Sequence, residues 1–520
     1  MSLAPKIILY PILSGVMLTA SFPPGKLEWM AWFALIPLLK SLNKVSPSNA
    51  FRLGIIAGLA HYLTLMYWIM SVLGNYGGLN PIVSFGIFLL LCFYLSLYTG
   101  LFSLLCNYLS GPLFPALMTA TIWVSIEWMR ATFLTGFPWC LLGYSQHRHL
   151  ILIQISDLFG VYGVSFLIVA VNALLYALFF KEGSQPMKVF FRSETFVVII
   201  FLIFSISYGY YRFAEYGPDQ GKKESVKVAI IQGNIDQSLK WNPEYQKETM
   251  DIYLRLSRST YPNKPRLIVW PETSTPFFFQ NENEYTVKIL RLAAESEAHL
   301  FFGSPAYKRD KNAITYYNRI YHISPRGYVQ GYYDKVHLVP FGEYVPMKKW
   351  LPFVHRLVPA AGDFTPGKEV ATLVLPDFTV GPLICYEAIF PEISRAHARK
   401  KADFFINLTN DAWFGVSSAP YQHLVMSSFR AIENRRPLIR AANTGFSAII
   451  NKRGEFIRKG DLFCEEVLTG EIEKNSTSRT FYSVYGDILV YLLILMCLIN
   501  IFCALCYHRL KAQWIHHKGE

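Results

Sequence analysis

Seven long apolar segments precede a polar region in this chain and an eighth follows it, and this pattern constrains the fold more than any other feature. Because a helix needs about 20 mostly apolar residues to cross a bilayer, we expect eight transmembrane helices, seven before the polar region and one after it. Charged residues make up only 16% of the chain, below the roughly 25% of soluble proteins. The segments lie at 7–22, 27–42, 53–74, 81–109, 112–129, 151–180, 195–213 and 484–507.

The distribution of Lys and Arg predicts how these helices are oriented. With the N-terminus inside the cell, ten basic residues fall on the inner side and three on the outer side, as the positive-inside rule requires. The polar region then faces away from the cytoplasm, and both termini lie on the cytoplasmic side. We therefore predict a membrane domain at 1–215, a polar domain at 220–478, and a final helix with a tail at 482–520. Although the net charge is +13, the basic residues are dispersed, so no nucleic-acid partner is expected.

The polar domain has the pattern of a mixed α/β fold. Short apolar or β-branched runs at 226–235, 266–270, 299–304 and 403–409 predict strands. Helical periodicity occurs near 243–259, 283–297 and 420–435, and the runs 315–324 and 447–458 are typical of hairpin strands. These elements predict a layered, sheet-rich domain with helices on its faces.

Three polar residues follow strands in this domain, where sheet scaffolds present reactive side chains. Glu272 follows "LIVWP", Lys335 lies in "YYDKVHLVPFGEYVP", and Cys385 ends "VGPLIC". A thiol has a pKa near 8.5 and needs a base or a positive neighbour to act as a nucleophile. Glu272 could take the proton, and Lys335 could stabilise the thiolate and a developing oxyanion.

Each of these residues also has an ordinary structural explanation. A cysteine that closes an apolar strand is usually part of a core, whereas Glu272 could cap a turn and Lys335 could lie on the surface. Spacing alone therefore does not decide whether the three residues form a catalytic site or occupy ordinary structural positions. The sequence contains no HExxH motif and no clear histidine ligand cluster, so we expect no metal and no other cofactor.

The motifs "VWPET", "YDKVHLVPFGEYVP" and "ICYE" resemble the Glu, Lys and Cys motifs of the nitrilase, or carbon–nitrogen hydrolase, superfamily. Together with seven preceding helices and one following helix, they resemble its membrane-embedded branch, the apolipoprotein N-acyltransferases. The stretches at 127–139, 232–241 and 407–415 are similar to signatures of that family. The resemblance implies an αββα sandwich joined to a helical membrane domain, in a bacterial inner membrane with the catalytic domain on the periplasmic side.

The resemblance also implies a role for particular residues. Cys385 would be the nucleophile, Glu272 the general base and Lys335 the stabiliser of the tetrahedral intermediate. Glu343 would be a second carboxylate in the site. Tyr386 and Glu387 would support the active-site pocket, and Trp241 would help to bind the substrate.

The implied reaction moves a fatty acyl chain from a phospholipid, expected to be phosphatidylethanolamine, to a protein. A thioester on Cys385 would form first. The α-amino group of the diacylglyceryl-modified N-terminal cysteine of an apolipoprotein would then take the acyl chain. Such sequential transfer implies ping-pong kinetics, and the enzyme would act as a monomer.

Two segments of the polar domain are unusually apolar for exposed loops. In 345–354, Trp350 and Phe353 are expected to dip into the membrane interface and help to bind substrate, as a lid at the lipid entrance. The segment 276–280, "PFFFQ", could contact the interface in the same way. The alternative for the aromatic residues of both segments is packing in the domain core.

Glu127 and Arg130 lie at the outer end of the fifth apolar segment. At helical spacing they are expected to pair with each other. Binding of a lipid headgroup is the alternative, because charges within a membrane are costly and often functional.

Two other functions remain open at this point. A membrane-tethered amidase or nitrilase would use the same three residues with water as the acceptor, and it would release free acid or ammonia. A transporter or lipid-binding protein is a second alternative. The presence of Glu272, Lys335 and Cys385 together disfavours it, because an inactive domain would tend to have lost one of them.

Overall fold

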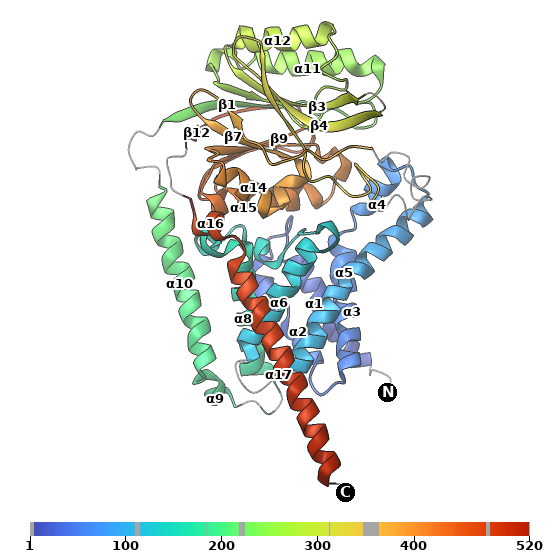
Figure 1. The fold of residues 1–520 in the computed structure, drawn as a ribbon, viewed down its shortest axis with the longest axis vertical. Helices are drawn as coiled ribbons and strands as arrows, with labels where there is room; N and C mark the ends of the chain where they lie inside the picture. Colours follow the sequence, from blue (N-terminus) through green and yellow to red (C-terminus); the bar gives the residue numbers. More distant parts are fainter. Residues whose placement is uncertain are drawn as a thin grey trace. The chain divides into compact units, whose positions relative to one another are not determined.

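The structure of the chain is a computed structural model that describes residues 5–109, 115–181, 183, 185–217, 224–310, 313–346, 363–474 and 479–518. The chain forms two compact units (Figure 1). The helical unit contains Met1–Tyr67, Gly86–Arg212 and Tyr485–Glu520, and the second unit contains Trp68–Phe85 and Phe213–Val484.

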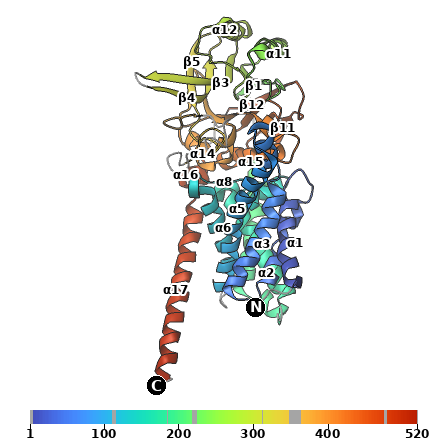
Figure 2. The same cartoon turned by 90° about the vertical axis from the view of Figure 1, so that its right-hand side faces the viewer.

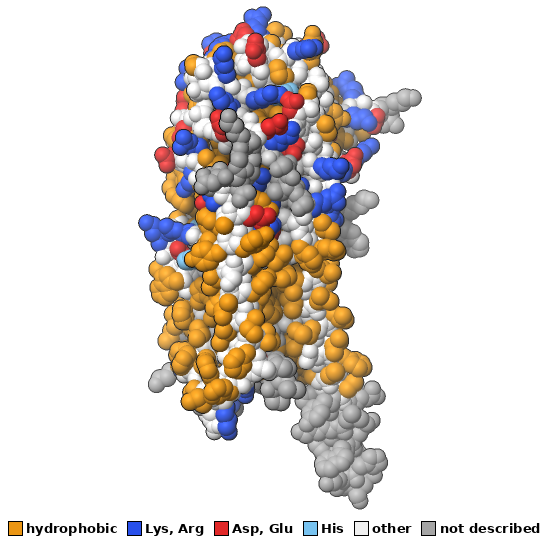
Figure 3. All heavy atoms as spheres, turned by 90° about the vertical axis from the view of Figure 1, so that its left-hand side faces the viewer, with side chains coloured by type: hydrophobic (Ala, Val, Ile, Leu, Met, Phe, Trp, Pro, Cys, Tyr) orange, Lys and Arg blue, Asp and Glu red, His pale blue; other side chains and the backbone are white. Residues whose placement is uncertain are grey.

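Long apolar helices form the helical unit. Four described helices are long and apolar enough to cross a membrane, and a fifth is added if α3 and the bent stretch Ile69–Tyr76 count as one span broken by 60°. In Figure 3 the side chains on the outside of these helices are mostly apolar, as lipid contact requires. The helices are α1 (Pro5–Ala20), α3 (Pro47–Leu65), α5 (Pro81–Leu109), α6 (Pro115–Thr132), α8 (Ser156–Leu175), α10 (Ser193–Glu215) and α17 (Ile488–Lys518).

Small residues allow α3 to approach its neighbours closely. A Cβ atom added at Gly54 would lie 2.4 Å from the Thr99 carbonyl oxygen of α5, and one at Gly58 would lie 2.7 Å from the Ser96 Cα. Figure 2 shows α1, α3 and α5 in the same part of the bundle. Helices packed in a membrane gain little from hydrophobic burial, so close backbone contact through small residues is their main source of attraction.

The segment predicted as a continuous helix at 27–42 is broken in the structure. It forms a 3₁₀ turn, η1 (Glu28–Trp32), followed by the six-residue helix α2 (Ile36–Ser41). Apolar composition alone did not reveal this break. An irregular segment whose backbone is hydrogen-bonded by neighbouring side chains can contain as many apolar residues as a continuous helix.

Two amides from other parts of the unit bond to this broken backbone. Asn172 of α8 accepts the Leu35 N–H at 2.9 Å and donates to the Ala31 carbonyl at 2.8 Å. Gln146 donates to the Glu28 carbonyl and accepts the indole N–H of Trp32, each at 3.0 Å. Unpaired backbone groups are costly in a membrane-embedded bundle, so these amides make the irregular segment possible.

The predicted pairing of Glu127 with Arg130 is wrong. The Glu127 carboxylate instead accepts the Leu142 N–H at 2.6 Å, and Arg130 donates to the carbonyls of Phe137 and Trp139 at 3.0 and 2.9 Å. Both side chains are buried. They bond to the irregular loop that follows α6, whose backbone polar groups would be costly to leave unpaired.

The second unit contains two six-stranded sheets, which confirms the α/β sandwich expected from the sequence. In the first sheet the order is β12 (Glu466–Glu473), β1 (Ser225–Gln232), β2 (Leu267–Val269), β3 (His299–Asp310), β4 (Ala313–Ile323) and β5 (Val329–Asp334). In the second sheet the order is β11 (Phe456–Lys459), β10 (Ala448–Ile450), β9 (Leu438–Ala442), β8 (Phe404–Thr409), β7 (Thr379–Ile384) and β6 (Leu373–Val374).

The alternation of side chains along the strands builds two layers of core. In β1, Val228 and Ile230 pack between the sheets, whereas Ala229 and Ile231 pack against the outer helices, as the two-residue period of a strand dictates. Figure 1 shows α11 (Gln246–Arg258) and α12 (Glu284–Ser296) on the outside of the first sheet, and α14 (Pro391–Arg399) and α15 (Ala419–Asn434) on the outside of the second. The short helix α16 (Phe481–Tyr485) follows the last strand.

In the segment 276–280, the core alternative is confirmed for Phe277 and Phe279. Phe279 is buried between the first sheet and its helices, and Phe277 packs against the same cluster. Phe278 contacts the rings of Tyr307 and Tyr316. The apolar run is therefore explained by packing within the domain.

A short part of the chain between α3 and α5 belongs to the second unit. It forms α4 (Ile69–Ser71) and η2 (Val72–Tyr76). The ring of Trp68 lies edge-on to Phe414 at 4.9 Å, and that of Tyr76 lies edge-on to Trp413 at 5.2 Å. These aromatic contacts hold the segment against the loop that follows β8.

We predict that Asn172→Leu destabilises the helical unit by about 1–3 kcal/mol, because it leaves the buried Leu35 N–H and Ala31 carbonyl without their side-chain partner. Thermal unfolding of the purified protein in detergent measures the change. Asn500→Leu on α17 is the control, since the Asn500 amide donates to the Met496 carbonyl of its own helix. Equal unfolding temperatures for the two variants would contradict the prediction.

Candidate active site

Three strand ends in the sandwich bring the predicted residues together. Glu272 follows β2 after Trp270 and Pro271, Lys335 follows β5 directly, and Cys385 follows β7 directly. The strands β2 and β5 belong to the first sheet and β7 to the second. Residues that are far apart in the sequence thus meet where the two sheets face each other.

The Lys335 ammonium lies between two carboxylates. Its Nζ atom is 2.8 Å from Glu343 Oε2 and 3.6 Å from Glu272 Oε1, and the lysine side chain is 1% exposed. Although burial opposes the charge, the two carboxylates raise the pKa of Lys335 above its usual range. The lysine is therefore a fixed positive charge, as a stabiliser of an oxyanion must be.

Asn318 joins the two carboxylates, and the sequence analysis did not identify it. From β4, its Nδ2 atom donates to Glu272 Oε1 at 2.8 Å and to Glu343 Oε1 at 2.9 Å. Glu343 also accepts the Val339 N–H through Oε2 at 2.7 Å. The only signal in the sequence was an amide within a strand of aromatic residues, which is too common to single out.

The Glu272 backbone is packed tightly against β3. A Cβ atom added at Gly303 would lie 2.3 Å from the Thr273 nitrogen and 2.7 Å from the Glu272 Cα. Thr273 itself has a φ of 45°, a conformation that non-glycine residues adopt only when surrounding contacts require it. Gly303 is the residue that lets the strand approach the carboxylate this closely.

Lys240 is a second buried lysine of the site that the sequence analysis missed. Its ammonium donates to Thr273 Oγ1 at 2.8 Å and to the Glu272 carbonyl at 3.3 Å. Burial lowers the pKa of Lys240 to about 8, although Glu272 and Cys385 oppose the shift. It precedes Trp241 in the "SLKW" stretch, where only the tryptophan had been singled out.

Cys385 occupies a strained turn at the end of β7. Its φ is 50°, and it begins a short 3₁₀ helix, η8 (Cys385–Ile389). The thiol is half-buried. Desolvation, and then the Glu272 carboxylate, raise the pKa of the Cys385 thiol above its usual range, and Lys335 opposes them. The raised pKa favours the protonated thiol, so a reaction at this sulfur would need a base.

Glu387 holds the loop that carries Lys335. Its Oε1 atom accepts the Tyr333 hydroxyl at 3.0 Å and the N–H groups of Val336 and His337 at 2.7 and 3.1 Å. Its Oε2 atom accepts the Ile384 N–H at 2.7 Å. Burial raises the pKa of Glu387 to about 7 despite these donors. This carboxylate links the backbone before Cys385 to the loop that carries Lys335.

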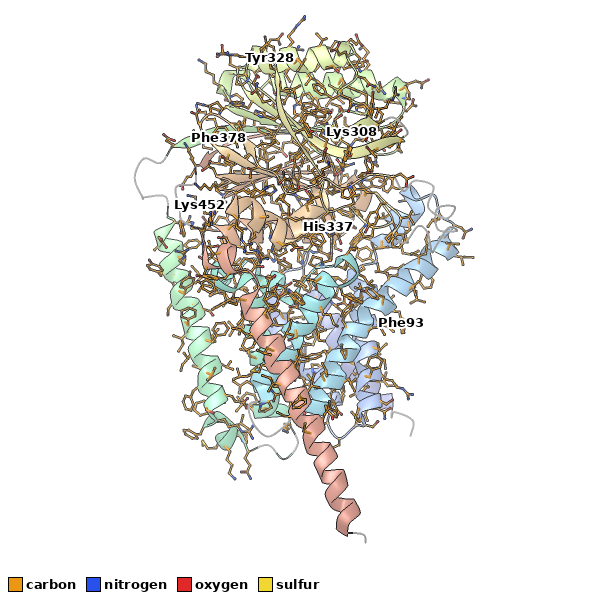
Figure 4. All side chains as sticks on the ribbon, in the orientation of Figure 1. Phe93, Lys308, Tyr328, His337, Phe378 and Lys452 are labelled. Carbon is orange, nitrogen blue, oxygen red and sulfur yellow. The ribbon has the colours of Figure 1, made fainter. Side chains whose placement is uncertain are left out.

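Tyr386 packs against the loop that carries Lys335. Its ring lies 5.0 Å from that of Phe390 and 5.9 Å from that of His337, and His337 lies in the sandwich unit (Figure 4). Trp241 is 49% exposed, next in the chain to Lys240. The predicted substrate-binding residues Trp350 and Phe353 lie outside the described residues.

The fold and this arrangement of Glu, Lys and Cys define a nitrilase-like domain. Residues 227–482 match the carbon–nitrogen hydrolase family, and residues 14–174 match the apolipoprotein N-acyltransferase N-terminal domain. The chain belongs to the apolipoprotein N-acyltransferase family, a family of membrane proteins, and the resemblance drawn from its motifs is confirmed.

Two relatives carry that family name over nearly their whole length. The apolipoprotein N-acyltransferase of Geobacter metallireducens is 44% identical over 92% of each chain. That of Rickettsia prowazekii is 31% identical over 92% of this chain and 94% of its own. A solved carbon–nitrogen hydrolase from Helicobacter pylori G27 is 20% identical, covering 48% of this chain and 89% of that chain with a TM-score of 0.37.

We predict that Asn318→Leu lowers turnover about 100-fold, because the two carboxylates lose their shared donor and no longer hold Lys335 in place. Steady-state kinetics of the purified enzyme measure this change. Asn281→Leu, in the loop after Phe279, is the control, since its amide oxygen bonds to the Tyr307 hydroxyl near the surface. Turnover of Asn318→Leu within threefold of wild type would contradict the prediction.

We predict that alkylation of Cys385 by iodoacetamide accelerates with pH up to at least pH 9. The raised pKa of the thiol means that the thiolate fraction keeps growing over that range. Peptide mass spectrometry of samples quenched at different times gives the rate for this cysteine alone. A rate that reaches its maximum below pH 7.5 would instead indicate a thiolate already formed beside Lys335.

Proposed function

We propose that this enzyme transfers a fatty acyl chain from a phospholipid to the N-terminal cysteine of an apolipoprotein, through a thioester on Cys385. The observation that carries the proposal is the buried Lys335 ammonium between Glu272 and Glu343, beside a thiol at a strained strand end. This arrangement combines a base, a fixed positive charge and a nucleophile, which acyl transfer requires.

In the first step, the Cys385 sulfur attacks the ester carbonyl of the donor. Glu272 takes the thiol proton, and Lys335 stabilises the oxyanion of the tetrahedral intermediate. The ester C–O bond breaks, and the departing alkoxide takes the proton from Glu272 to give a lysophospholipid. The products are a thioester and an enzyme ready for a second substrate.

In the second step, the free α-amino group of the diacylglyceryl-modified cysteine attacks the thioester. An N–C bond forms, Glu272 takes a proton from the nitrogen, and Lys335 again stabilises the oxyanion. The C–S bond then breaks and the thiolate recovers a proton from Glu272. The first step exchanges an ester for a thioester, and the thioester then carries an activated acyl group into the second step, so the proposed reaction uses no metal and no other cofactor.

The proposed orientation places the sandwich unit on the periplasmic side of a bacterial inner membrane, with both termini in the cytoplasm. The excess of Lys and Arg in the inner loops supports it. Eight crossings are consistent with this orientation if the broken segment 28–41 returns the chain to the beginning of α3. Phosphatidylethanolamine is the proposed donor, and a monomer is the proposed functional form.

The proposal predicts an acyl adduct on Cys385 after incubation with phosphatidylethanolamine. Intact mass spectrometry should show the mass of one acyl chain on the wild-type protein, removed by hydroxylamine, and none on Cys385→Ala. Glu272→Gln should form the adduct at least about 100-fold more slowly, because no base then takes the thiol proton.

Addition of a diacylglyceryl-modified peptide separates acyl transfer from hydrolysis. Loss of the adduct together with a gain of one acyl chain on the peptide amine supports the proposed reaction. Release of free fatty acid with an unchanged peptide would instead identify a hydrolase related to the amidases. Absence of an adduct while the phospholipid is bound would contradict the thioester.

A further inference from the structure

A buried polar network lies behind the nucleophile and is not needed by the proposed reaction steps. His423 of α15 has its Nδ1 atom 2.9 Å from Asp411 Oδ1 and 3.1 Å from Arg440 Nη2. Arg440, from β9, donates to Asp411 Oδ2 at 2.7 Å. These three side chains are at most 1% exposed. Buried charges are costly unless they are paired, so the network requires an explanation beyond chance.

The network ends on the backbone of the nucleophile itself. His423 Nε2 lies 3.3 Å from the Cys385 carbonyl oxygen, and Asn407 Nδ2 donates to the same oxygen at 3.4 Å. Arg440 in turn bonds to Asn407 Oδ1. Two donors therefore meet at one carbonyl, and the same guanidinium that contacts the histidine holds the second donor.

The side chain of Cys385 is influenced by the network as well. Desolvation raises the pKa of the Cys385 thiol, and Thr409, whose hydroxyl donates to Asp411 Oδ1 at 3.0 Å, opposes that rise. The groups that hold the Cys385 carbonyl are therefore linked through Asp411 to a side chain that acts on the thiol.

The helix α15 holds both ends of the short helix η8. His423 contacts the carbonyl of its first residue, and Arg430 donates to the carbonyl of its last, Ile389, at 3.2 Å. The two positions are seven residues apart and so lie on one face of α15, two turns from each other. The positive φ of Cys385 persists only if surrounding contacts enforce it, and these contacts do so.

The protonation of His423 follows from its partners. A carbonyl oxygen can only accept, so Nε2 must carry a proton to bond to Cys385. This holds whether Nδ1 accepts from Arg440 in a neutral ring or donates to Asp411 in a charged one. The aspartate and the arginine therefore orient the ring so that it presents an N–H group to the nucleophile.

We propose that His423, oriented by Asp411 and Arg440, is a positioning residue that holds Cys385 in its strained conformation and so sets the rate at which the thiol reacts. This inference rests on the proposed role of Cys385 as the nucleophile. It extends the site beyond Glu272 and Lys335 to a group that never touches the substrate. Because the same thiol acts in both half-reactions, both should depend on His423.

The test compares two substitutions of His423 with a matched control. His423→Phe replaces the imidazole with an aromatic ring that has no nitrogens. His423→Gln instead places an amide N–H within reach of the Cys385 carbonyl. His322→Phe is the control, since His322 is also buried and bonds to one side chain, His299, at 2.9 Å. We expect His423→Phe to lower kcat about 100-fold, with KM for the phospholipid within threefold, and His423→Gln to recover at least tenfold.

A second readout does not depend on acyl transfer. The rate of Cys385 alkylation by iodoacetamide should fall at least tenfold in His423→Phe, recover in His423→Gln, and stay within twofold in His322→Phe. If the wild-type protein forms no acyl adduct, the proposed function fails, but the alkylation rates still test the positioning role. Wild-type kcat and alkylation in His423→Phe would overturn the inference, as would equal losses in both His423 variants that follow their loss of thermal stability.

Discussion

The rest of the candidate site depends on the two ion pairs that the buried Lys335 ammonium makes with Glu272 and Glu343. A single positive charge removed from water is stable only if opposite charges lie next to it, and Glu272 and Glu343 provide them. Two carboxylates this close would repel each other without the lysine and the Asn318 amide between them. The pairing therefore fixes Glu272 and the Lys335 charge together, and it does so with side chains that follow or lie in β2, β4 and β5.

The Cys385 thiol, the proposed nucleophile, is held by a different part of the fold. Cys385 follows β7 of the second sheet, and its strained backbone is enclosed by groups from β8, β9 and α15. Glu272 and Lys335 follow strands of the first sheet, so their distance from the thiol depends on how the two sheets pack. The apolar layer between the sheets, which includes Val269 and Ile384, is consequently part of what aligns these three side chains.

The helical unit applies the same physical rule to a different problem. Its irregular segments are apolar in composition yet contain backbone groups that cannot remain unpaired in a bilayer. Asn172, Gln146, Glu127 and Arg130 all bond to such backbone. Glu127 and Arg130, which the sequence also offers as a headgroup site, thus act in the structure as partners for the main chain.

The sequence by itself determined the apolar helices, the sandwich class and the motif residues Glu272, Lys335 and Cys385, because these depend on local periodicity and on short motifs. Most predicted helices and strands lie within a few residues of the observed ones, but the breaks within 27–42 and within 53–74 were missed. Only the tertiary structure decided the roles of Asn318, Lys240 and His423, whose contacts with Glu272 or Cys385 join residues 32 or more positions apart in the sequence. A polar side chain within a strand or helix looks ordinary until folding brings a charge or a strained carbonyl next to it, since hydrogen bonds act over about 3 Å of space and not along the chain.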